Sequence, residues 1–183
     1  DGLHLKCITK REDPRDALIS RNYVNLKDLP QGAKIGTSSL RRQSQLLNFR
    51  PDFEILQLRG NLDTRLKKLE DGHYDAIILA GAGVKRLGLE DKITELIPIE
   101  ISLPAIGQGA LGIEIREGDG HTEDLVEFLN HIPTSYVVRA ERSFLKRLEG
   151  GCQVPVAAYG ELEGDTLRLT GLVAATDGTR IIK

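Results

Sequence analysis

Short apolar runs alternate with stretches of helical periodicity in the first half of the chain. Residues 34–37, 53–58 and 74–79 have the composition of strands, and each run is followed by a helix-like segment. The last of these runs is apolar enough for a strand that is buried on both faces of a sheet. This order of strands and helices predicts a small parallel α/β lobe.

Helix signals follow each of the three runs. We expect one helix from about residue 39 to 49, a second that has Asn61 as its cap, and a short third one over residues 81–86. The second helix has a continuous apolar face made by Leu62, Leu66 and Leu69. Ahead of the lobe, Asp13 and Pro14 have the pattern of a cap and a first helical residue, so a short helix is expected in this charged stretch.

The pattern changes in the second half of the chain. Residues 101–110 form a connector with glycine and proline and no regular period. Residues 111–115 alternate apolar and polar positions, as do residues 2–9 at the start of the chain. Both alternating stretches predict strands.

Two helices and three strands are expected to complete the chain. Pro133 is predicted to break a helix over residues 122–132, and Thr134 is predicted to cap a longer helix that ends near residue 148. Three strand-like runs with Gly-Asp and Asp-Gly turns then predict an antiparallel meander over residues 154–162, 167–174 and 179–182.

The composition is that of a soluble globular protein. Hydrophobic residues make up 40% and charged residues 28% of the 183 residues, and no apolar run approaches the ~20 residues of a membrane span. A net charge of −2 does not favour nucleic acid or membranes as partners. Two distant cysteines indicate a reducing compartment, and the histidines lack the spacing of a metal site. Because methionine is absent and both ends look like interrupted strands, we expect a fragment of a larger protein.

Cys152 stands on a short loop between two regular elements. Gly150 and Gly151 are suited to end the preceding helix, and Pro155 keeps it from resuming. Two interpretations of the thiol remain open, a small residue packed into a tight corner and a reactive group. Cys7 lies within a predicted strand and is expected to be a packed core thiol.

Arginines gather at the strand-to-helix junctions of the predicted lobe. In a parallel sheet these junctions share the carboxyl edge, where open α/β sheets bind ligands. Cations in the first turn of a helix oppose its dipole, which is understandable if an anion binds between them. Guanidinium groups suit carboxylates and phosphates, so we expect a polyanion site, the alternative being a set of solvated surface residues. The arginines concerned are Arg41, Arg42, Arg59, Arg65 and Arg86.

A dinucleotide cofactor is not favoured by the glycine motifs. Residues 107–112 match the letters of Gly-x-Gly-x-x-Gly, but they precede a strand, whereas the fingerprint follows a strand and opens a helix. Gly81 and Gly83 have the right context, but Arg86 stands where the third glycine belongs.

Five motifs follow one another in a specific order along nearly the whole chain. They are Arg-Glu-Asp-Pro-Arg-Asp-Ala at 11–17, Thr-Ser-Ser-Leu-Arg-Arg-Gln at 37–43, Leu-Arg-Gly-Asn followed by Thr-Arg-Leu at 58–66, Leu-Pro-Ala-Ile-Gly-Gln-Gly at 103–109, and Glu-Gly-Gly-Cys-Gln-Val-Pro at 149–155. Together they resemble the porphobilinogen deaminases, which are also called hydroxymethylbilane synthases.

The resemblance implies a multi-domain α/β fold. Its lobes would have parallel or mixed sheets of the periplasmic-binding-protein type. In addition, it would have a small α+β domain with a three-stranded antiparallel sheet. Residues 1–10 and 108–128 would be the remainder of domain 1. Residues 15–104 would form domain 2, and residues 132–183 would form a domain 3 that is incomplete at its C-terminal end.

The resemblance also implies a transferase activity. Such an enzyme condenses four porphobilinogen molecules head to tail, with loss of ammonia, into the linear tetrapyrrole hydroxymethylbilane. One dipyrromethane primer per chain would be attached to Cys152 through a thioether. Further cofactor binding is implied for Ser39, Arg41, Arg42, Arg59, Arg65 and Gln108. Substrate binding is implied for Arg59, Arg65 and Arg86, and no metal is expected.

One family motif, His-Ser-x-Lys-Asp-x-Pro, is missing from this sequence. The principal catalytic aspartate is therefore expected in an N-terminal segment outside the chain, and the fragment alone is expected to be inactive. The family also implies a cytoplasmic monomer that passes its product to uroporphyrinogen III synthase. The alternative is a non-catalytic polyanion- or solute-binding module, because hinged α/β lobes with an arginine cleft also describe such proteins. An aromatic content of 4% disfavours a nucleic-acid binder.

Overall fold

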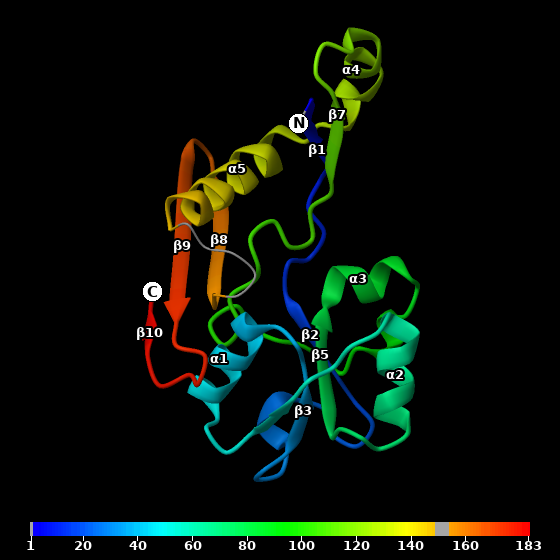
Figure 1. The fold of residues 1–183 in the computed structure, drawn as a ribbon, viewed down its shortest axis with the longest axis vertical. Helices are drawn as coiled ribbons and strands as arrows, with labels where there is room; N and C mark the ends of the chain where they lie inside the picture. Colours follow the sequence, from blue (N-terminus) through cyan, green and yellow to red (C-terminus); the bar gives the residue numbers. More distant parts are fainter. Residues whose placement is uncertain (1, 149–153) are drawn as a thin grey trace.

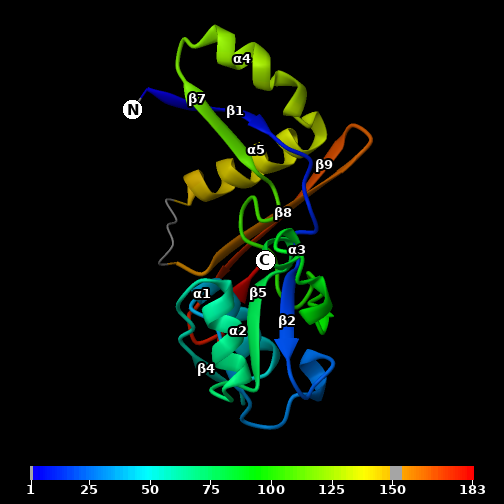
Figure 2. The same cartoon turned by 90° about the vertical axis from the view of Figure 1, so that its right-hand side faces the viewer.

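The computed structural model describes residues 2–148 and 154–183, which form three separate sheets (Figure 1). One sheet has five strands in the order β4-β3-β5-β2-β6, one has three strands in the order β10-β9-β8, and one consists of β1 and β7. In Figures 1 and 2 the five-stranded sheet lies at one end of an elongated molecule and the β1–β7 pair lies at the other.

The five-stranded sheet has mixed direction. Its strands are β2 (Asp16–Ser20), β3 (Lys34–Gly36), β4 (Glu54–Leu56), β5 (Ala76–Ala80) and β6 (Glu95–Leu96). Strand β3 runs parallel to both β4 and β5, whereas β2 runs antiparallel to β5 and β6. The predicted parallel strands are thus confirmed, and two further strands extend the sheet.

Three helices follow the parallel strands as the apolar pattern predicts. They are α1 (Leu40–Phe49), α2 (Leu62–Glu70) and α3 (Gly81–Arg86). Leu18 and Ile78 belong to one buried cluster of the lobe, and Ile19 and Ile77 belong to another. Successive residues of a strand point to opposite faces. The sheet is therefore buried on both faces, as predicted for its central strand.

The helix predicted to begin at Pro14 is wrong. The carboxylate of Asp13 accepts hydrogen bonds from the backbone N–H and the Nε of Arg15, both at 3.0 Å, so it caps no helix. Strand β2 begins one residue later, at Asp16, which lies opposite Ala80 of β5. The apolar stretch that follows Asp16 is a central strand. Because it is buried on both faces, its sequence lacks the alternation of apolar and polar residues that marks a half-exposed strand.

The β1–β7 pair carries a small helix at its far end. Strands β1 (Leu3–Ile8) and β7 (Gly112–Arg116) are antiparallel, and α4 (Gly120–Val126) follows β7. Instead of one helix over residues 122–132, α4 passes into a 3-10 turn, Glu127–Leu129. Two more such turns, Leu26–Asp28 and Glu90–Lys92, lie in loops of the five-stranded lobe.

Helix α5 (Ile132–Arg147) includes Pro133 in its first turn, so the predicted break at this proline is wrong. A proline is tolerated there because the first N–H groups of a helix have no partner within the helix. The cap is His131 rather than Thr134, since the Nδ1 of His131 accepts the backbone N–H of Thr134 at 3.4 Å.

The predicted antiparallel meander is confirmed. Strands β8 (Val156–Glu163), β9 (Thr166–Ala174) and β10 (Ile181–Ile182) pair in sequence, and α5 packs against β8 and β9 (Figure 1). Among the described residues, no helix combines the length and the apolar character needed to cross a membrane.

Candidate functional site

The carboxyl edge of the five-stranded sheet brings together the start of α1 and the start of β2. Strands β3 and β5 are parallel, so α1 and α3 both begin at this edge. Strand β2 is antiparallel to β5, and its first residue, Asp16, lies beside Ala80 at the same edge. A carboxylate therefore faces the arginines that the sequence placed in the first turn of α1.

Ser39 caps α1, because its Oγ accepts the backbone N–H of Arg42 at 3.4 Å. The cap fixes the first turn of the helix, in which Arg41 and Arg42 follow directly. Both side chains reach the carboxylate of Asp16, which is completely buried.

The Asp16 carboxylate has four side-chain partners. The Nη1 and Nη2 of Arg41 donate to its two oxygens at 2.8 and 3.1 Å, and the Nε and Nη2 of Arg42 both approach Oδ1, at 2.9 and 2.8 Å. The Ser102 hydroxyl donates at 2.7 Å and the Gln108 amide at 3.0 Å. We call Asp16 and these four partners the Asp16 cluster.

Burial opposes ionisation of Asp16, but the charges and hydrogen bonds of Arg42 and Arg41 outweigh it. They hold the pKa of the Asp16 carboxyl well below its ordinary value. Burial lowers the pKa of Arg42, an effect that the Asp16 charge opposes. With both arginines charged, two positive groups face one negative group. The Asp16 cluster therefore carries one surplus positive charge.

The two arginines differ in their further contacts. Arg41 is buried, and its Nη1 also donates to the backbone oxygen of Leu103 at 2.7 Å. Gln45 fixes the same residue, because its Oε1 accepts the N–H of Leu103 at 2.7 Å. Arg41 thus ties α1 to the connector, and direct ligand contact by Arg41 stays a prediction. The Arg42 side chain is 11% exposed.

None of the remaining predicted arginines pairs with Asp16 in the described part of the chain. Arg65, in α2, donates from Nε to the oxygen of Gly60 at 2.8 Å, and its charge acts on Arg42. Arg59 is exposed, in the loop before α2. Arg86 is also exposed, at the end of α3 rather than at its start. Their binding roles stay predictions.

A cavity of about 450 Å³ lies beside the first turn of α1. This volume is within the roughly 300–1,000 Å³ that is typical of small-molecule sites. Ser38, Ser39 and Arg41 provide polar groups on the α1 side, and apolar side chains of the connector, of α5, of β8 and of the residues just before β8 line it elsewhere. The lining residues are Ser38, Ser39, Leu40, Arg41, Ala105, Ile106, Leu145, Val154 and Val156.

The cavity has the chemical character that a dipyrromethane requires. Two pyrrole rings need apolar walls, and their acetate and propionate arms need donors and positive charge. Leu145, Val154 and Ile106 supply the first, and the capped start of α1 beside the Asp16 cluster supplies the second. Val154 is two residues beyond Cys152 in sequence. Cys152 itself lies outside the described residues, and its attachment role stays a prediction.

Gln108 makes several hydrogen bonds within the protein. Its amide nitrogen donates to the backbone oxygen of Pro14 at 2.6 Å and to Asp16, while its backbone oxygen accepts from the Nε of Arg11 at 2.9 Å. Gln108 therefore joins the connector to the stretch that precedes β2. Its predicted contact with a cofactor stays untested.

Sequence reasoning also missed a second buried carboxylate, that of Glu141 in α5. Arg11 Nη1 donates to Glu141 Oε1 at 2.6 Å, and the N–H groups of Gly107 and Gly160 donate to the two oxygens at 2.7 and 2.9 Å. The Arg11 guanidinium also lies over the Tyr159 ring, 5.2 Å from its centroid. We call Glu141 and these partners the Glu141 cluster. It joins α5, β8, the connector and residue 11.

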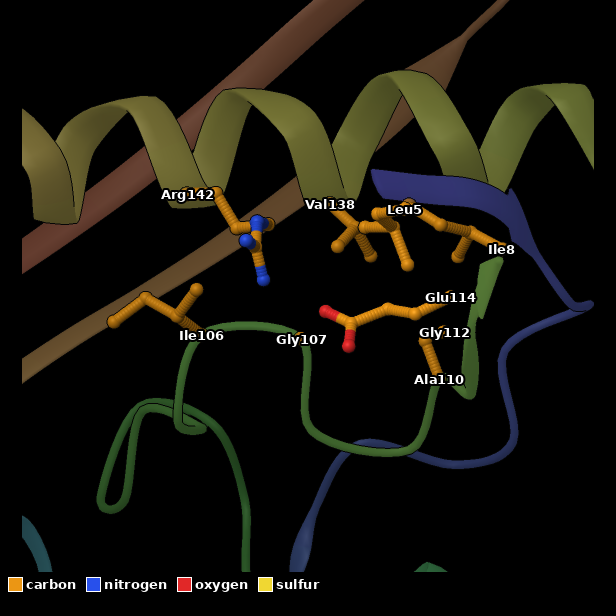
Figure 3. Close-up of a pocket in the computed structure, with 9 residues that line it drawn as sticks. All are labelled: Leu5, Ile8, Ile106, Gly107, Ala110, Gly112, Glu114, Val138 and Arg142. Atoms are coloured by element: carbon orange, nitrogen blue, oxygen red, sulfur yellow. The ribbon is translucent and has the colours of Figure 1, made fainter. Parts of the chain in front are cut away.

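Another cavity, of about 320 Å³, lies between the β1–β7 pair, the connector and α5. Figure 3 shows Glu114 and Arg142 pointing into it from opposite sides, with Leu5, Ile8 and Val138 around them. None of the predicted site residues lines this cavity. We therefore assign the candidate site to the cavity beside α1.

Cys7 is a packed core thiol, as predicted. It is completely buried and its Sγ donates to the backbone oxygen of Val126 at 3.2 Å. Burial raises the pKa of the Cys7 thiol. No group of histidine, cysteine and acidic side chains suited to a metal ion occurs among residues 2–148 and 154–183.

Solved structures similar to the chain include a periplasmic substrate-binding protein of an ABC transporter from Coxiella burnetii. The identity is 17%, the TM-score is 0.46, and the match covers 79% of this chain and 67% of that one. A likeness of this degree supports no statement about ligand or activity.

Comparison of the sequence with protein families and with curated proteins finds much more similar relatives. Residues 1–124 match the family described as "Porphobilinogen deaminase, dipyromethane cofactor binding domain", and residues 135–183 match "Porphobilinogen deaminase, C-terminal domain". The whole chain is 60% identical to a porphobilinogen deaminase of Geobacter metallireducens and 58% identical to one of Geobacter sulfurreducens. It spans 57% of the length of each of these relatives. The chain belongs to the porphobilinogen deaminase family.

Proposed function

We propose that the full-length protein is a hydroxymethylbilane synthase. It condenses four porphobilinogen molecules head to tail, with loss of ammonia, and releases a linear tetrapyrrole after hydrolysis. A dipyrromethane, bound through a thioether to Cys152, serves as the primer. The observation that carries this proposal is the cavity beside α1, because its apolar walls and its surplus positive charge suit pyrrole rings with carboxylate arms in a chain of this family.

Arg42 is the residue of the Asp16 cluster that we propose to bind a carboxylate arm. Its side chain is 11% exposed, compared with 7% for Arg41, and Asp16 orients it without cancelling the charge of both arginines. Ser39 and Arg41, which flank the start of α1, line the cavity beside Arg42, whereas the Ser38 hydroxyl is already bonded to the backbone of Leu58. Arg41 holds the connector and the carboxylate of Asp16 in place, so that the charge of Arg42 is fixed before a ligand arrives.

Arg59, Arg65 and Arg86 are proposed to bind the carboxylates of incoming substrate. Arg65 supports this assignment because α2 follows β4, which is parallel to β3, so that α2 begins at the same sheet edge as α1. When bound, the dipyrromethane would supply a free pyrrole α-carbon as the nucleophile that displaces ammonia from porphobilinogen, with loss of the proton of that carbon. Each added ring brings two carboxylates, which a positive region without a metal can hold.

The finer points of the proposal concern the protein's surroundings. We propose a cytoplasmic monomer that passes its product to a uroporphyrinogen III synthase. The small-molecule substrate and the absence of a membrane-spanning helix among the described residues are compatible with this setting.

The test is the intact mass of the full-length protein under denaturing conditions. Wild type and Cys7→Ser should both carry the added mass of a dipyrromethane, whereas Cys152→Ser should carry none. Cys7 is the matched control because it is a buried thiol held by a hydrogen bond within the fold. A solute-binding module would release its ligand in denaturant, so wild-type protein without any covalent adduct would contradict the proposal.

A further inference from the structure

The turn between β9 and β10 is seated on α1. Gly178 is buried in this turn and has a φ of +72°, a conformation that glycine adopts readily. A Cβ at this position would lie 2.6 Å from both the Ser44 oxygen and the Asn48 nitrogen of the α1 backbone. Figure 1 shows the turn beside the C-terminal part of α1. The contact is therefore one of backbone against backbone, which leaves little freedom to shift.

Two hydrogen bonds fix the turn on the helix. The amide nitrogen of Asn48 donates to the oxygen of Gly178 at 3.0 Å, and that of Gln43 donates to the oxygen of Thr176 at 3.2 Å. Within the turn, the N–H of Gly178 donates to Ala175 at 3.0 Å. The turn is thus braced internally as well as on α1.

The turn is connected through β9 to the wall of the cavity that Val154 and Val156 form. The N–H of Ala174 donates to the oxygen of Pro155 at 3.0 Å, and Val173 lies opposite Val156 in the sheet. Val154 and Val156 line the cavity, and the first turn of α1 lines it from the other side. One end of α1 therefore forms a wall, and its other end holds the sheet that forms the facing wall.

We propose that the turn over residues 176–178 is a positioning element, which sets the separation of the two cavity walls through Gly178 and Asn48. This inference rests on the function proposed above, because Val154 and Val156 follow Cys152 in the sequence, while the facing wall is the first turn of α1, in which Arg41 lines the cavity and Arg42 follows it. The turn would hold the wall formed by Val154 and Val156 at a fixed distance from the first turn of α1. Gly178 and Asn48 contact neither the cavity nor the Asp16 cluster in the described residues.

The test compares two glycine variants of the full-length protein. Gly178→Ala places a methyl group against the α1 backbone, whereas Gly164→Ala, in the turn between β8 and β9, meets nothing within 4 Å. Both glycines have positive φ, at +72° and +57°, so both variants carry the backbone strain of alanine. Any difference between the two variants therefore measures the effect of the added methyl group on the contact with α1.

The readouts are the fraction of protein with the covalent adduct, and the kcat and KM of the loaded enzyme, all below the melting temperature of each variant. A misplacement of about 1 Å can reduce a rate by about 10²-fold. We expect Gly178→Ala to reduce the fraction of protein that carries the adduct. It should also reduce kcat of the loaded enzyme by up to about 10²-fold, with a smaller change in KM. Gly164→Ala should stay near wild type in all three.

Asn48→Ala keeps the inference testable if Gly178→Ala fails to fold. This variant removes one hydrogen bond from an exposed residue near the end of a helix, and it should reduce kcat in the same direction by a smaller factor. Equal kcat per loaded molecule in Gly178→Ala and Gly164→Ala would overturn the inference. So would a wild-type kcat in Asn48→Ala. Absence of the adduct from wild type would instead contradict the proposed function.

Discussion

Asp16 and Glu141 are both completely buried carboxylates, yet they are neutralised differently. Glu141 pairs with one arginine, Arg11, and its other partners are backbone N–H groups. Asp16 pairs with two arginines, so its cluster keeps a positive charge beside a cavity. A balanced cluster braces the fold, whereas a cluster with surplus charge also prepares a site for an anion. The difference can be tested by removing one charge at a time.

The largest effect is expected from Asp16→Asn. The variant keeps the shape of the side chain but leaves two guanidiniums facing each other without a counter-charge. Removing one partner of a buried ion pair typically costs about 3–5 kcal/mol, and we expect the free energy of unfolding to fall by the upper part of this range. Urea denaturation at neutral pH measures it. Asp52→Asn, on the partly exposed Arg50 pair, is the control and should cost far less.

Arg11→Ala should cost somewhat less than Asp16→Asn. It leaves Glu141 with two backbone N–H donors, which continue to stabilise the buried charge. We expect a loss toward the lower part of about 3–5 kcal/mol in the same denaturation experiment. Lys85→Ala removes a more exposed pair with Glu12, in which the side chains are 33% and 51% exposed, and should cost far less than Arg11→Ala because water screens the pair. Equal losses for Arg11→Ala and Lys85→Ala would show that the Glu141 cluster does not brace the fold.

Arg42→Ala should separate stability from ligand binding. Arg41 still pairs with Asp16 in this variant, so we expect a loss of only about 1–3 kcal/mol. Cofactor loading, read as intact mass under denaturing conditions, should fall much further because the surplus charge is gone. Arg42→Lys should restore loading only in part, since a lysine lacks the two-pronged guanidinium. Wild-type loading in Arg42→Ala would remove Arg42 from the proposed site.

The sequence pattern predicted the elements whose signals are local. The three parallel strands of the five-stranded sheet, the cap of α2 at Asn61 and the antiparallel meander all follow from periodicity and turn residues, and the structure confirms them. Strand β2 was missed because Asp13 and Pro14 imitate a helix start, while the real partner of Asp13 is Arg15. Pro133 predicts a break because sequence alone does not reveal which turn of a helix a proline occupies, and in the structure it lies in the first turn of α5.

The position of Arg41 and Arg42 in the first turn of a helix was predicted, but not the carboxylate that orders them. Arg41 and Arg42 stand out as cations in the first turn of a helix. Asp16 is 25 residues away from Arg41 in sequence, and only the antiparallel direction of β2 brings it to the same sheet edge. A charged residue directly before a wholly apolar run was the available signal. Contacts of this kind depend on topology, which local periodicity does not specify.

The smallest expected effect is the pH dependence of the Asp16 cluster. The ordinary pKa of the aspartate is 3.8, and the folded value is lower, so the folded state binds the proton less well than the unfolded state. The stabilisation is therefore complete above the unfolded pKa and is lost as the pH falls through it toward the folded pKa. We expect the gap in unfolding free energy between wild type and Asp16→Asn to be constant from about pH 7 to about pH 5 and to narrow below about pH 4. Most other carboxylates titrate alike in both proteins and cancel in the difference. Asp52→Asn is the comparison, because Arg50 lowers the pKa of Asp52 to about 2. The difference in unfolding free energy between wild type and Asp52→Asn should be smaller at neutral pH and should narrow over the same pH range. A gap for Asp16→Asn that is unchanged down to about pH 3 would mean that the ionised form of Asp16 does not stabilise the cluster.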